Sequence, residues 1–475
     1  MNYKYLAIFI LLFLLIYEIV DFNITHIEGL RRYELTNTCI VSFLVLFIYG
    51  LIPSKYKRLN KQFFKISTIF IISFYIVHFF NYVFYSFNVV DLSFFSSEYT
   101  LKAAKLSLCF LIALVLGIIL TNKSFDDKPE ESLNLNIIKI IPLFQTISLI
   151  IFYSFTDKRY FSAGGNSAVL NDIGWNPIGA VGNVICVACV IASVAAIYYR
   201  YKNNKHVTIK EYIKSFPLLL YVNTFVYLSL VLISGDRGPI LDILFVVSSG
   251  YFLITNKKIK IVYIIVALFV AANVLSFLSY LRGNPEDLSI AKIEVVSNRM
   301  AEASEDGNII YNLTDDLSDV VNSYHLVFEY TQRFGFIYGF GIIFQLLAFL
   351  PGIRSILYSL SGIDISILST DFLATMLLGE DYGAGTTCVA DVYYNLGLYG
   401  GIVAYFLFGV FIKKCDIALY LKSNNYLVII ISLCYLTKSI YLGRSTILQP
   451  INLFVYTYLI FIISNLIANK IFRFK

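Results

Sequence analysis

Residues 106–121, LSLCFLIALVLGIILT, form an apolar run that contains no charged side chain. A helix needs about 20 residues to cross the hydrocarbon core of a bilayer. Comparable runs recur on both sides of this one, at 6–20, 38–52, 66–87, 137–155, 178–198, 216–234, 239–256, 261–281, 396–412, 426–441 and 447–467. We therefore expect an all-α polytopic membrane protein with about 12 transmembrane helices.

The composition agrees with this interpretation and excludes a set of soluble domains. Of the 475 residues, 58% are hydrophobic and only 14% are charged, whereas about 25% are charged in typical soluble domains. The formal net charge of +6 requires no nucleic-acid partner if the excess of basic residues lies in cytoplasmic loops. The partner that the composition predicts is the lipid bilayer.

The distribution of basic residues predicts the orientation of the chain, because cytoplasmic loops are enriched in Lys and Arg. Of the 37 basic residues, 23 lie at the two termini or in or beside the even-numbered loops, and 14 belong to the odd-numbered loops. Both termini are therefore expected in the cytoplasm. The resulting organisation is 1–281 for transmembrane helices one to nine, 282–395 for one large external loop, and 396–475 for helices ten to twelve.

The external loop is the part of the chain most expected to carry function, since such a long loop in a compact bundle is rarely only a connection. Residues 284–319 are polar and acidic. The apolar run Phe336–Leu350, which ends at Pro351, is short for a crossing and is predicted to be an interfacial or re-entrant helix. A glycine-rich stretch, 379–387, follows near the end of the loop.

Three arginines lie at the outer ends of predicted spans: Arg237, Arg282 and Arg444. Arg237 and Arg444 precede predicted helix N-termini, where the helix dipole repels a cation, and external arginines oppose the charge bias that sets topology. A bound anion would offset both costs, because guanidinium groups and free helix N–H groups bind phosphate oxygens together. We predict a shared anion site at these residues, to which Arg159 and Arg333 add.

Ordinary explanations stay open for each arginine alone. Its side chain can extend to the interface, or it can pair with a nearby carboxylate, as Arg237 would with Asp236 or Asp242. Asp242 lies inside a predicted span, where a carboxylate is costly and is usually either paired or functional. Ser445 is the expected N-cap of the last span.

Motifs for several other chemistries are absent from the sequence. It contains no Walker loop, no HExxH, no Cys/His cluster with zinc spacing and no GxSxG, so we expect neither a metal nor another cofactor. Cys186 and Cys189 form a CxxC pair inside an apolar run, where packing is the expected role. His325, in the external loop, is a candidate base, although a lone loop histidine is more often only solvated.

Several short motifs match a known family. They are SGDRGP at 234–239, an arginine that closes the next external crossing, LP at 350–351, AGTTCVADVYYNLGLYGG at 384–401 and GRST at 443–446. Together with twelve spans and a large external loop, they resemble the bacterial O-antigen polysaccharide polymerases of the Wzy family. The topology is similar over the whole chain, and the residue-level likeness covers about 230–285 and 335–450. Relatives commonly have Glu where Asp391 stands.

The resemblance implies a metal-independent glycosyltransferase of lipopolysaccharide biosynthesis. It would lie in the bacterial cytoplasmic (inner) membrane, with its active site facing the periplasm or the cell exterior. Its donor and acceptor would be oligosaccharides linked to undecaprenyl pyrophosphate, and the growing glycan would move to the non-reducing end of a new lipid-linked repeat unit. A chain-length regulator protein is a further expected partner.

The resemblance also implies roles for individual residues. Arg237, Arg282 and Arg444 would stabilise the leaving diphosphate, and Asp391 would be the base that takes the proton of the acceptor hydroxyl. Contacts to the substrate are expected from Arg159, Arg333, His325, Tyr393 and Asn395. Aromatic residues near a helix start are also ordinary interface anchors, and this alternative stays open for the tyrosine.

Three other functions remain as alternatives. An O-antigen ligase has a similar architecture and the same donor, and a defined external histidine such as His325 would favour it. A lipid-linked oligosaccharide flippase or transporter would need charges along a midplane cavity and repeat-related halves, neither of which the sequence indicates. A multi-span glycosyltransferase that uses lipid-phosphosugars would place acids in the first external loop, where Asp21, Glu28 and Glu34 form no paired motif.

Overall fold

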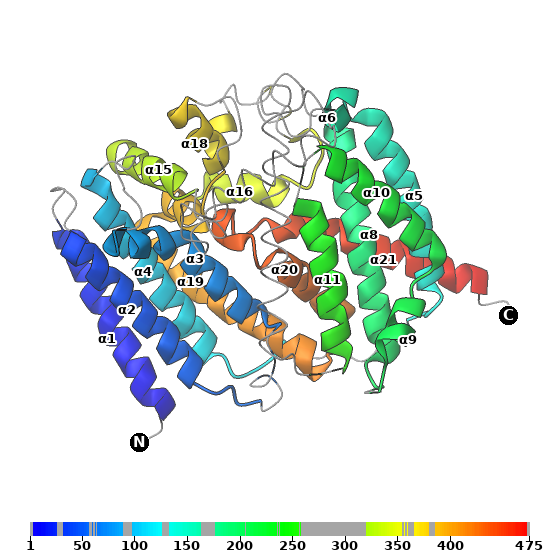
Figure 1. Ribbon diagram of the computed structural model, residues 1–475, viewed down its shortest axis with the longest axis horizontal. Coiled ribbons are helices and arrows are strands. Elements are labelled where there is room, and N and C mark those ends of the chain that lie inside the picture. Colours follow the sequence, from blue (N-terminus) through cyan, green and yellow to red (C-terminus); the bar gives the residue numbers. More distant parts are fainter. Residues whose placement is uncertain are drawn as a thin grey trace.

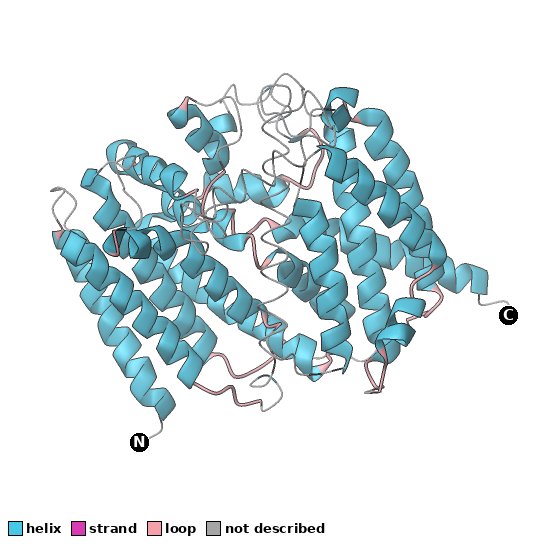
Figure 2. Cartoon of the chain, in the orientation of Figure 1, coloured by secondary structure: helices cyan, strands magenta, loops and turns pink. Residues whose placement is uncertain are grey.

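The computed structural model is helical, and no strand occurs among the residues that it describes (Figure 2). Those residues are 3–25, 32–56, 59, 62, 64–88, 97–125, 133–162, 176–204, 206–234, 236, 238–255, 257, 320–353, 356, 359, 365–379 and 385–472. Within them, nine helices are long and apolar enough to cross a membrane. They are α1 (Tyr3–Ile24), α2 (Arg32–Leu51), α3 (Ile66–Ser86), α4 (Ser97–Leu120), α5 (Ile137–Phe155), α8 (Pro177–Tyr201), α11 (Gly238–Thr255), α19 (Cys388–Leu421) and α21 (Pro450–Phe472).

Two shorter apolar helices complete the set of helices at predicted spans: α10 (Leu218–Ser234) and α20 (Tyr426–Lys438). The predicted span 261–281 lies outside the described residues. The remaining short elements are α6 (Lys158–Ser162), α9 (Ile209–Lys214), α15 (Val321–Phe334), α16 (Phe340–Leu347), η2 (Ile365–Leu368), α18 (Thr370–Leu378) and η3 (Leu442–Arg444). The expected all-helical fold is thus confirmed for the described residues, and its long apolar helices fit a polytopic membrane protein.

Most of the long helices run between two opposite ends of the molecule, whereas α21 is drawn crossing them (Figure 1). We call the end that carries α15, α16 and α18 the upper end, as it is drawn. The described N-terminus lies at the opposite end. The short helix α16 falls within the run predicted to form an interfacial or re-entrant helix, and it lies across the upper end rather than along the bundle (Figure 1).

The most extensive helix–helix contact is that between α4 and α19, and glycine residues let these two helices come close. A Cβ atom added at Gly117 of α4 would collide with the carbonyl oxygen of Phe406, and one added at Gly409 of α19 would collide with that of Leu114. Glycine therefore lets the two backbones approach at both positions, as is common between membrane helices.

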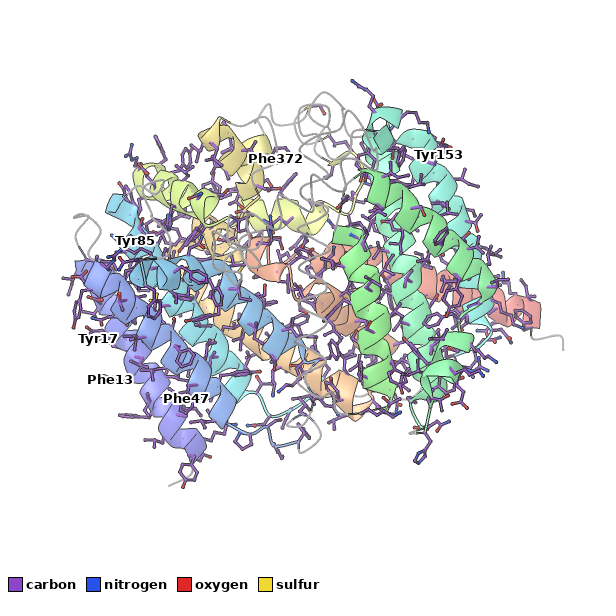
Figure 3. The ribbon with its side chains drawn as sticks, in the orientation of Figure 1. Phe13, Tyr17, Phe47, Tyr85, Tyr153 and Phe372 are labelled. Carbon is purple, nitrogen blue, oxygen red and sulfur yellow. The ribbon has the colours of Figure 1, made fainter. Side chains whose placement is uncertain are left out.

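The outer surface of several long helices is apolar and aromatic. Phe13 of α1, Phe47 of α2 and Tyr153 of α5 are all exposed and lie on the outside of the bundle (Figure 3). Such a surface would be unfavourable in water but is the ordinary lipid-facing side of a membrane helix. The core, by contrast, runs continuously through the inner faces of α3, α4, α8, α19 and α20.

One element departs from its predicted limits in a way that positions the site. The tenth span is predicted at 396–412, whereas α19 extends from Cys388 to Leu421 and is broken at Gly397, whose φ of 66° and ψ of −167° are not helical. Residues 388–395 are thus helical although they are predicted as the end of the external loop. The predicted domain boundary at 395/396 falls next to this break.

Candidate functional site

Asp391 lies in the first turn of α19 at the upper end, and its side chain is held by residues of three helices, α16, α18 and α19 itself. The residue is 1% exposed. Its Oδ1 atom accepts hydrogen bonds from Gln345 of α16 (2.7 Å), from the Thr370 hydroxyl of α18 (3.3 Å) and from Asn395 one turn further along α19 (3.5 Å). No described residue donates a hydrogen bond to Oδ2. The carboxylate is thus fixed through one oxygen, while the other keeps its acceptor capacity.

The break in α19 is what attaches α16 to this carboxylate. At Gly397 the helical hydrogen-bond pattern is interrupted, so the carbonyls of Tyr394 and Asn395 lose their usual helical partners. They accept instead from the backbone N–H groups of Ile337 (3.0 Å) and Gly339 (2.9 Å), just before α16. This segment therefore caps the first part of α19 and brings Gln345 over Asp391.

The Asn395 side chain forms a second link between α19 and α16. Its Nδ2 donates to the Asp391 carbonyl (2.9 Å), and its Oδ1 accepts from the backbone N–H of Ile342 (3.1 Å). A Cβ atom at Gly341 would lie 2.7 Å from Asn395 Oδ1 and 2.7 Å from the Leu368 carbonyl oxygen. Only glycine lets α16 approach this closely, so the position of Gln345 depends on it.

The two tyrosines after Asp391 are buried inside this layer. Tyr393 stacks on Phe328 of α15, with 5.0 Å between ring centroids, and its hydroxyl accepts from Gln332. The Tyr394 hydroxyl donates to the Ile367 carbonyl at 3.0 Å. Neither ring faces the lipid surface, so the role of interface anchor, left open from the sequence, does not fit Tyr393. Both hold α15 and η2 against α19.

His325 lies on α15, and the expectation that it is solvated in an open loop is wrong. The residue is 3% exposed, and its Nε2 shares a hydrogen bond of 2.5 Å with the Tyr82 hydroxyl of α3. Burial lowers the pKa of His325 to about 3. The imidazole is therefore neutral at physiological pH, and its Nε2 is occupied by a protein partner.

The arginines that the structure describes lie apart from one another. Arg333 is exposed on α15 and pairs with Glu329. Arg159 is exposed on α6, beside α10, and pairs with Asp157 at 2.9 Å. Arg444 is half-buried in η3, which packs between α3 and α19. Arg159 therefore does not share the α15–α19 region with Arg333.

Arg237 and Arg282 lie outside the described residues, so the predicted three-arginine anion site stays a prediction. The N-terminus of α11 beside it is described. Asp236 Oδ1 accepts from the Gly238 N–H at 3.1 Å, so a carboxylate of the protein already caps part of this helix end. Asp242 forms its ion pair with Lys438 of α20.

The expected N-cap of the last helix is wrong. The last helix, α21, begins at Pro450, and the Ser445 hydroxyl donates to the Gln449 side chain at 2.8 Å instead of capping it. Proline at the first helical position has no N–H to satisfy and favours the helical φ, so the helix starts at Pro450, five residues after Ser445.

Three polar residues of the site were missed in the sequence: Gln332, Gln345 and Thr370. A signal existed for Gln345, because it is the only amide side chain in the apolar run Phe336–Leu350. A lone polar residue on an otherwise apolar helix at a membrane surface usually has a buried partner. Nothing comparable marks Gln332 or Thr370, which lie in mixed polar segments.

Comparison of the chain with models of protein families, with curated proteins and with solved structures gave no match. The function is therefore argued from the geometry of the upper end. In that geometry α15 packs on α19 and brings Phe328 and Gln332 against Tyr393, whereas His325 and Arg333 of the same helix contact Tyr82 and Glu329.

Proposed function

We propose that this protein is a glycosyltransferase that polymerises lipid-linked oligosaccharide repeat units at the outer face of a bacterial cytoplasmic membrane, as O-antigen polymerases do. The observation that carries the proposal is the Asp391 carboxylate. It is held through Oδ1 by side chains from three helices, and Oδ2 has no donor among the described residues. A carboxylate at the membrane surface that is fixed through one oxygen and can accept a proton on the other is suited to act as a general base.

In the proposed reaction, the acceptor hydroxyl at the non-reducing end attacks the anomeric carbon of the donor's first sugar. The new bond forms between the hydroxyl oxygen and this carbon, while the bond from the carbon to the diphosphate oxygen breaks. Asp391 takes the hydroxyl proton, and undecaprenyl pyrophosphate leaves with the bonding electron pair. Asn395 and Gln345 act as positioning residues, because both contact the base.

The diphosphate would be bound by arginines. Arg444 contributes from η3 beside α19, and we propose that Arg237 and Arg282 complete the site, because guanidinium groups stabilise the charge that develops on the leaving group. The upper end would face the cell exterior, both termini the cytoplasm, and a chain-length regulator would bind from outside. Arg333, which is exposed on α15, is proposed to contact sugars next to this site, and Tyr393 to hold α15 in place.

The ligase alternative is weakened by His325. A ligase would need a histidine that meets the substrate, whereas His325 is buried and bonded to Tyr82. The flippase alternative gains no support from Asp391, because that carboxylate lies beyond the break in α19, close to one end of the bundle.

The test is the polysaccharide pattern of a deletion strain complemented with variants. Deletion should abolish the ladder of O-antigen lengths in lipopolysaccharide electrophoresis and leave core with one repeat unit. Asp391→Asn, and alanine at Arg237, Arg282 or Arg444, should reproduce this pattern while the protein still inserts, as measured by membrane abundance of a tagged chain.

The matched control is Asp157→Asn. It makes the same chemical change at an acid that pairs with Arg159 of α6, beside α10, and should keep the ladder. Complete loss of O-antigen on deletion would favour a flippase or ligase. A normal ladder from Asp391→Asn would exclude this residue as the base.

A further inference from the structure

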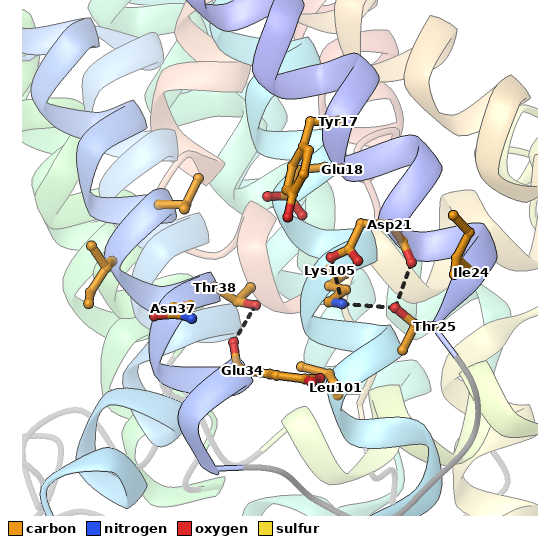
Figure 4. A pocket seen from close by; sticks show the side chains of 12 residues that line it. Tyr17, Glu18, Asp21, Ile24, Thr25, Glu34, Asn37, Thr38, Leu101 and Lys105 are labelled. Carbon is orange, nitrogen blue, oxygen red and sulfur yellow. Dashed lines mark hydrogen bonds and ion pairs between the residues drawn. The ribbon is translucent and has the colours of Figure 1, made fainter.

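Asp391 is enclosed too tightly to meet a sugar in this structure. The residue is 1% exposed, and its neighbours Thr370 and Asn395 are 0% exposed. Asp391 lines neither the cavity of about 560 Å³ between α1, α2 and α4 (Figure 4) nor the cavity of about 30 Å³ beside Lys4. A base must come within hydrogen-bond distance of the hydroxyl that it deprotonates. If Asp391 is the base, part of the upper end must therefore move.

Of the two helices that contact Asp391 from outside α19, α16 is the one held less by packing. It lies across the upper end (Figure 1), and of its eight residues only Gly341 and Phe344 are buried. Its outer face is apolar and exposed, so lipid can cover it as well as protein can. By contrast, α18 packs extensively along α15. The element that can leave Asp391 at the lower cost is thus α16.

Glycines in the left-handed backbone region flank α16 on both sides. Gly339 precedes it with φ of 83°, and Gly352 follows it with φ of 75°. A Cβ atom at Gly339 would make only an ordinary contact, 3.7 Å from Leu396, and one at Gly352 would meet nothing within 4 Å. The backbone conformation rather than packing therefore requires glycine, and glycine can change its φ at little cost. The two positions have the character of hinges.

Three hydrogen bonds from the described residues hold the segment between these glycines in place. Gln345 donates to the carboxylate, and the Ile342 N–H donates to Asn395. Beyond the end of α16, the Tyr456 hydroxyl of α21 donates to the Phe349 carbonyl. Opening would exchange these bonds for bonds to water, at a small net cost for each. Gln345 Oε1, which is buried without a partner among the described residues, would gain one.

We propose that residues 340–351 form a lid over Asp391, which opens about Gly339 and Gly352 to admit the acceptor sugar and closes over its hydroxyl. The inference rests on the proposed function, because it assigns the movement to that reaction. Gln345 moves with the lid, so Asp391 is fully aligned only when the lid is closed. Closure also keeps bulk water from the base, which limits hydrolysis of the lipid-linked donor.

The test is the rate at which a buried thiol reacts with a charged maleimide in the full-length protein in phospholipid nanodiscs. Thr370→Cys places the thiol beneath the lid, because Thr370 contacts the same carboxylate oxygen as Gln345. The native Cys109 and Cys189 are 0% exposed in α4 and α8 and serve as references for global unfolding. Peptide mass spectrometry separates the sites. The introduced thiol should react at least about tenfold faster than both references, since local opening costs less than global unfolding.

A second substitution tests whether the lid controls this rate. Tyr456→Phe removes the bond to the Phe349 carbonyl and should speed labelling at Thr370→Cys about fivefold, as loss of one neutral hydrogen bond predicts. Tyr221→Phe is the matched control. It removes the same kind of bond, from a tyrosine hydroxyl to the Ile213 carbonyl, on α10, and should leave the rate unchanged.

The proposal is overturned if the introduced thiol reacts no faster than the references, or if Tyr456→Phe and Tyr221→Phe give the same rate. At high maleimide concentration the labelling rate becomes the opening rate, and opening slower than kcat of chain extension would also overturn it. Labelling does not depend on the polysaccharide ladder. Failure of the polymerase proposal is therefore recognised separately, by a normal ladder in the deletion strain.

Discussion

At the scale of single residues, the two oxygens of Asp391 have different surroundings. Oδ1 accepts from Gln345, Thr370 and Asn395, whereas Oδ2 has no described donor. The fixed oxygen sets the direction of the other one. Loss of Gln345 should therefore disturb the alignment of the proposed base more than it disturbs the fold, because Thr370 and Asn395 still hold the carboxylate.

Gln345→Leu should lower kcat by about 10- to 100-fold and leave KM nearly unchanged, since a misaligned base affects the transition state more than ground-state binding. The measurement is chain extension in vitro with purified protein and lipid-linked repeat units. Thr370→Val should have a smaller effect, because the hydrogen bond from Thr370 to Asp391 (3.3 Å) is longer than the one from Gln345 (2.7 Å). A rise in KM at constant kcat would assign Gln345 to substrate binding instead.

His325 predicts a pH dependence of stability. Its pKa is about 3 in the fold and about 6.5 in an unfolded chain. Between these values the unfolded chain binds the proton and the folded chain does not, so stability falls as the pH drops below about 6.5. Between pH 7.5 and pH 5, the free energy of unfolding should therefore fall by about 2 kcal/mol less in His325→Gln than in the wild type.

Thermal unfolding in detergent at the two pH values measures this difference. The comparison is the fall in unfolding temperature within each variant, so a general destabilisation of His325→Gln does not affect it. An equal fall in wild type and variant would mean that the pKa of His325 is the same in the folded and the unfolded chain.

At the scale of elements, the break in α19 depends on one glycine. Gly397 has φ of 66° and ψ of −167°, a region that is essentially restricted to glycine. A Cβ atom there would also lie 3.1 Å from the Phe336 ring. Gly397→Ala should therefore destabilise the protein by about 1–3 kcal/mol and impair polymerisation, because α16 is attached at this break.

Gly50→Ala is the matched substitution, because a Cβ atom at Gly50 of α2 meets nothing within 4 Å. It should be neutral or slightly stabilising, since alanine favours a helix more than glycine does. Unfolding in detergent measures both variants. Equal stability of the two would show that α19 tolerates a side chain at its break.

Hydrophobic runs predict most of the fold, and local chemistry predicts much less of the site. Runs such as 106–121 identify membrane helices because the bilayer permits few alternatives to an internally bonded helix. The helical start of α19 was missed because residues 388–395 are polar enough to read as loop. Asp391 and Asn395 were selected as site residues, but Gln345 and Thr370 are brought to them only by tertiary packing, which spacing along the chain does not encode. The ion pair between Asp242 and Lys438 could not be predicted either, because its two residues lie far apart in the sequence and meet only through tertiary packing.

At the scale of the whole molecule, the cysteines permit a direct test of orientation. All seven are free and buried, so a membrane-impermeant thiol reagent should give little background on intact cells. Tyr338→Cys, at an 82% exposed position of the upper end, should be labelled from outside. Lys214→Cys, on α9 at the opposite end, should be labelled only after the cells are opened. The reverse pattern would place the Asp391 region in the cytoplasm and exclude the proposed reaction.

The capped break in α19 also constrains how the chain is made. Ile337 and Gly339 leave the ribosome more than fifty residues before Gly397. The carbonyl groups of residues 394 and 395, which accept from their N–H groups in the fold, have not been synthesised at that point. The α16 segment therefore cannot reach its final position during its own insertion. It must stay at the membrane surface or with an insertion factor until α19 has been inserted. Assembly of the layer around Asp391 is thus expected to follow insertion, and truncated nascent chains that stop before residue 394 should leave α16 open to protease.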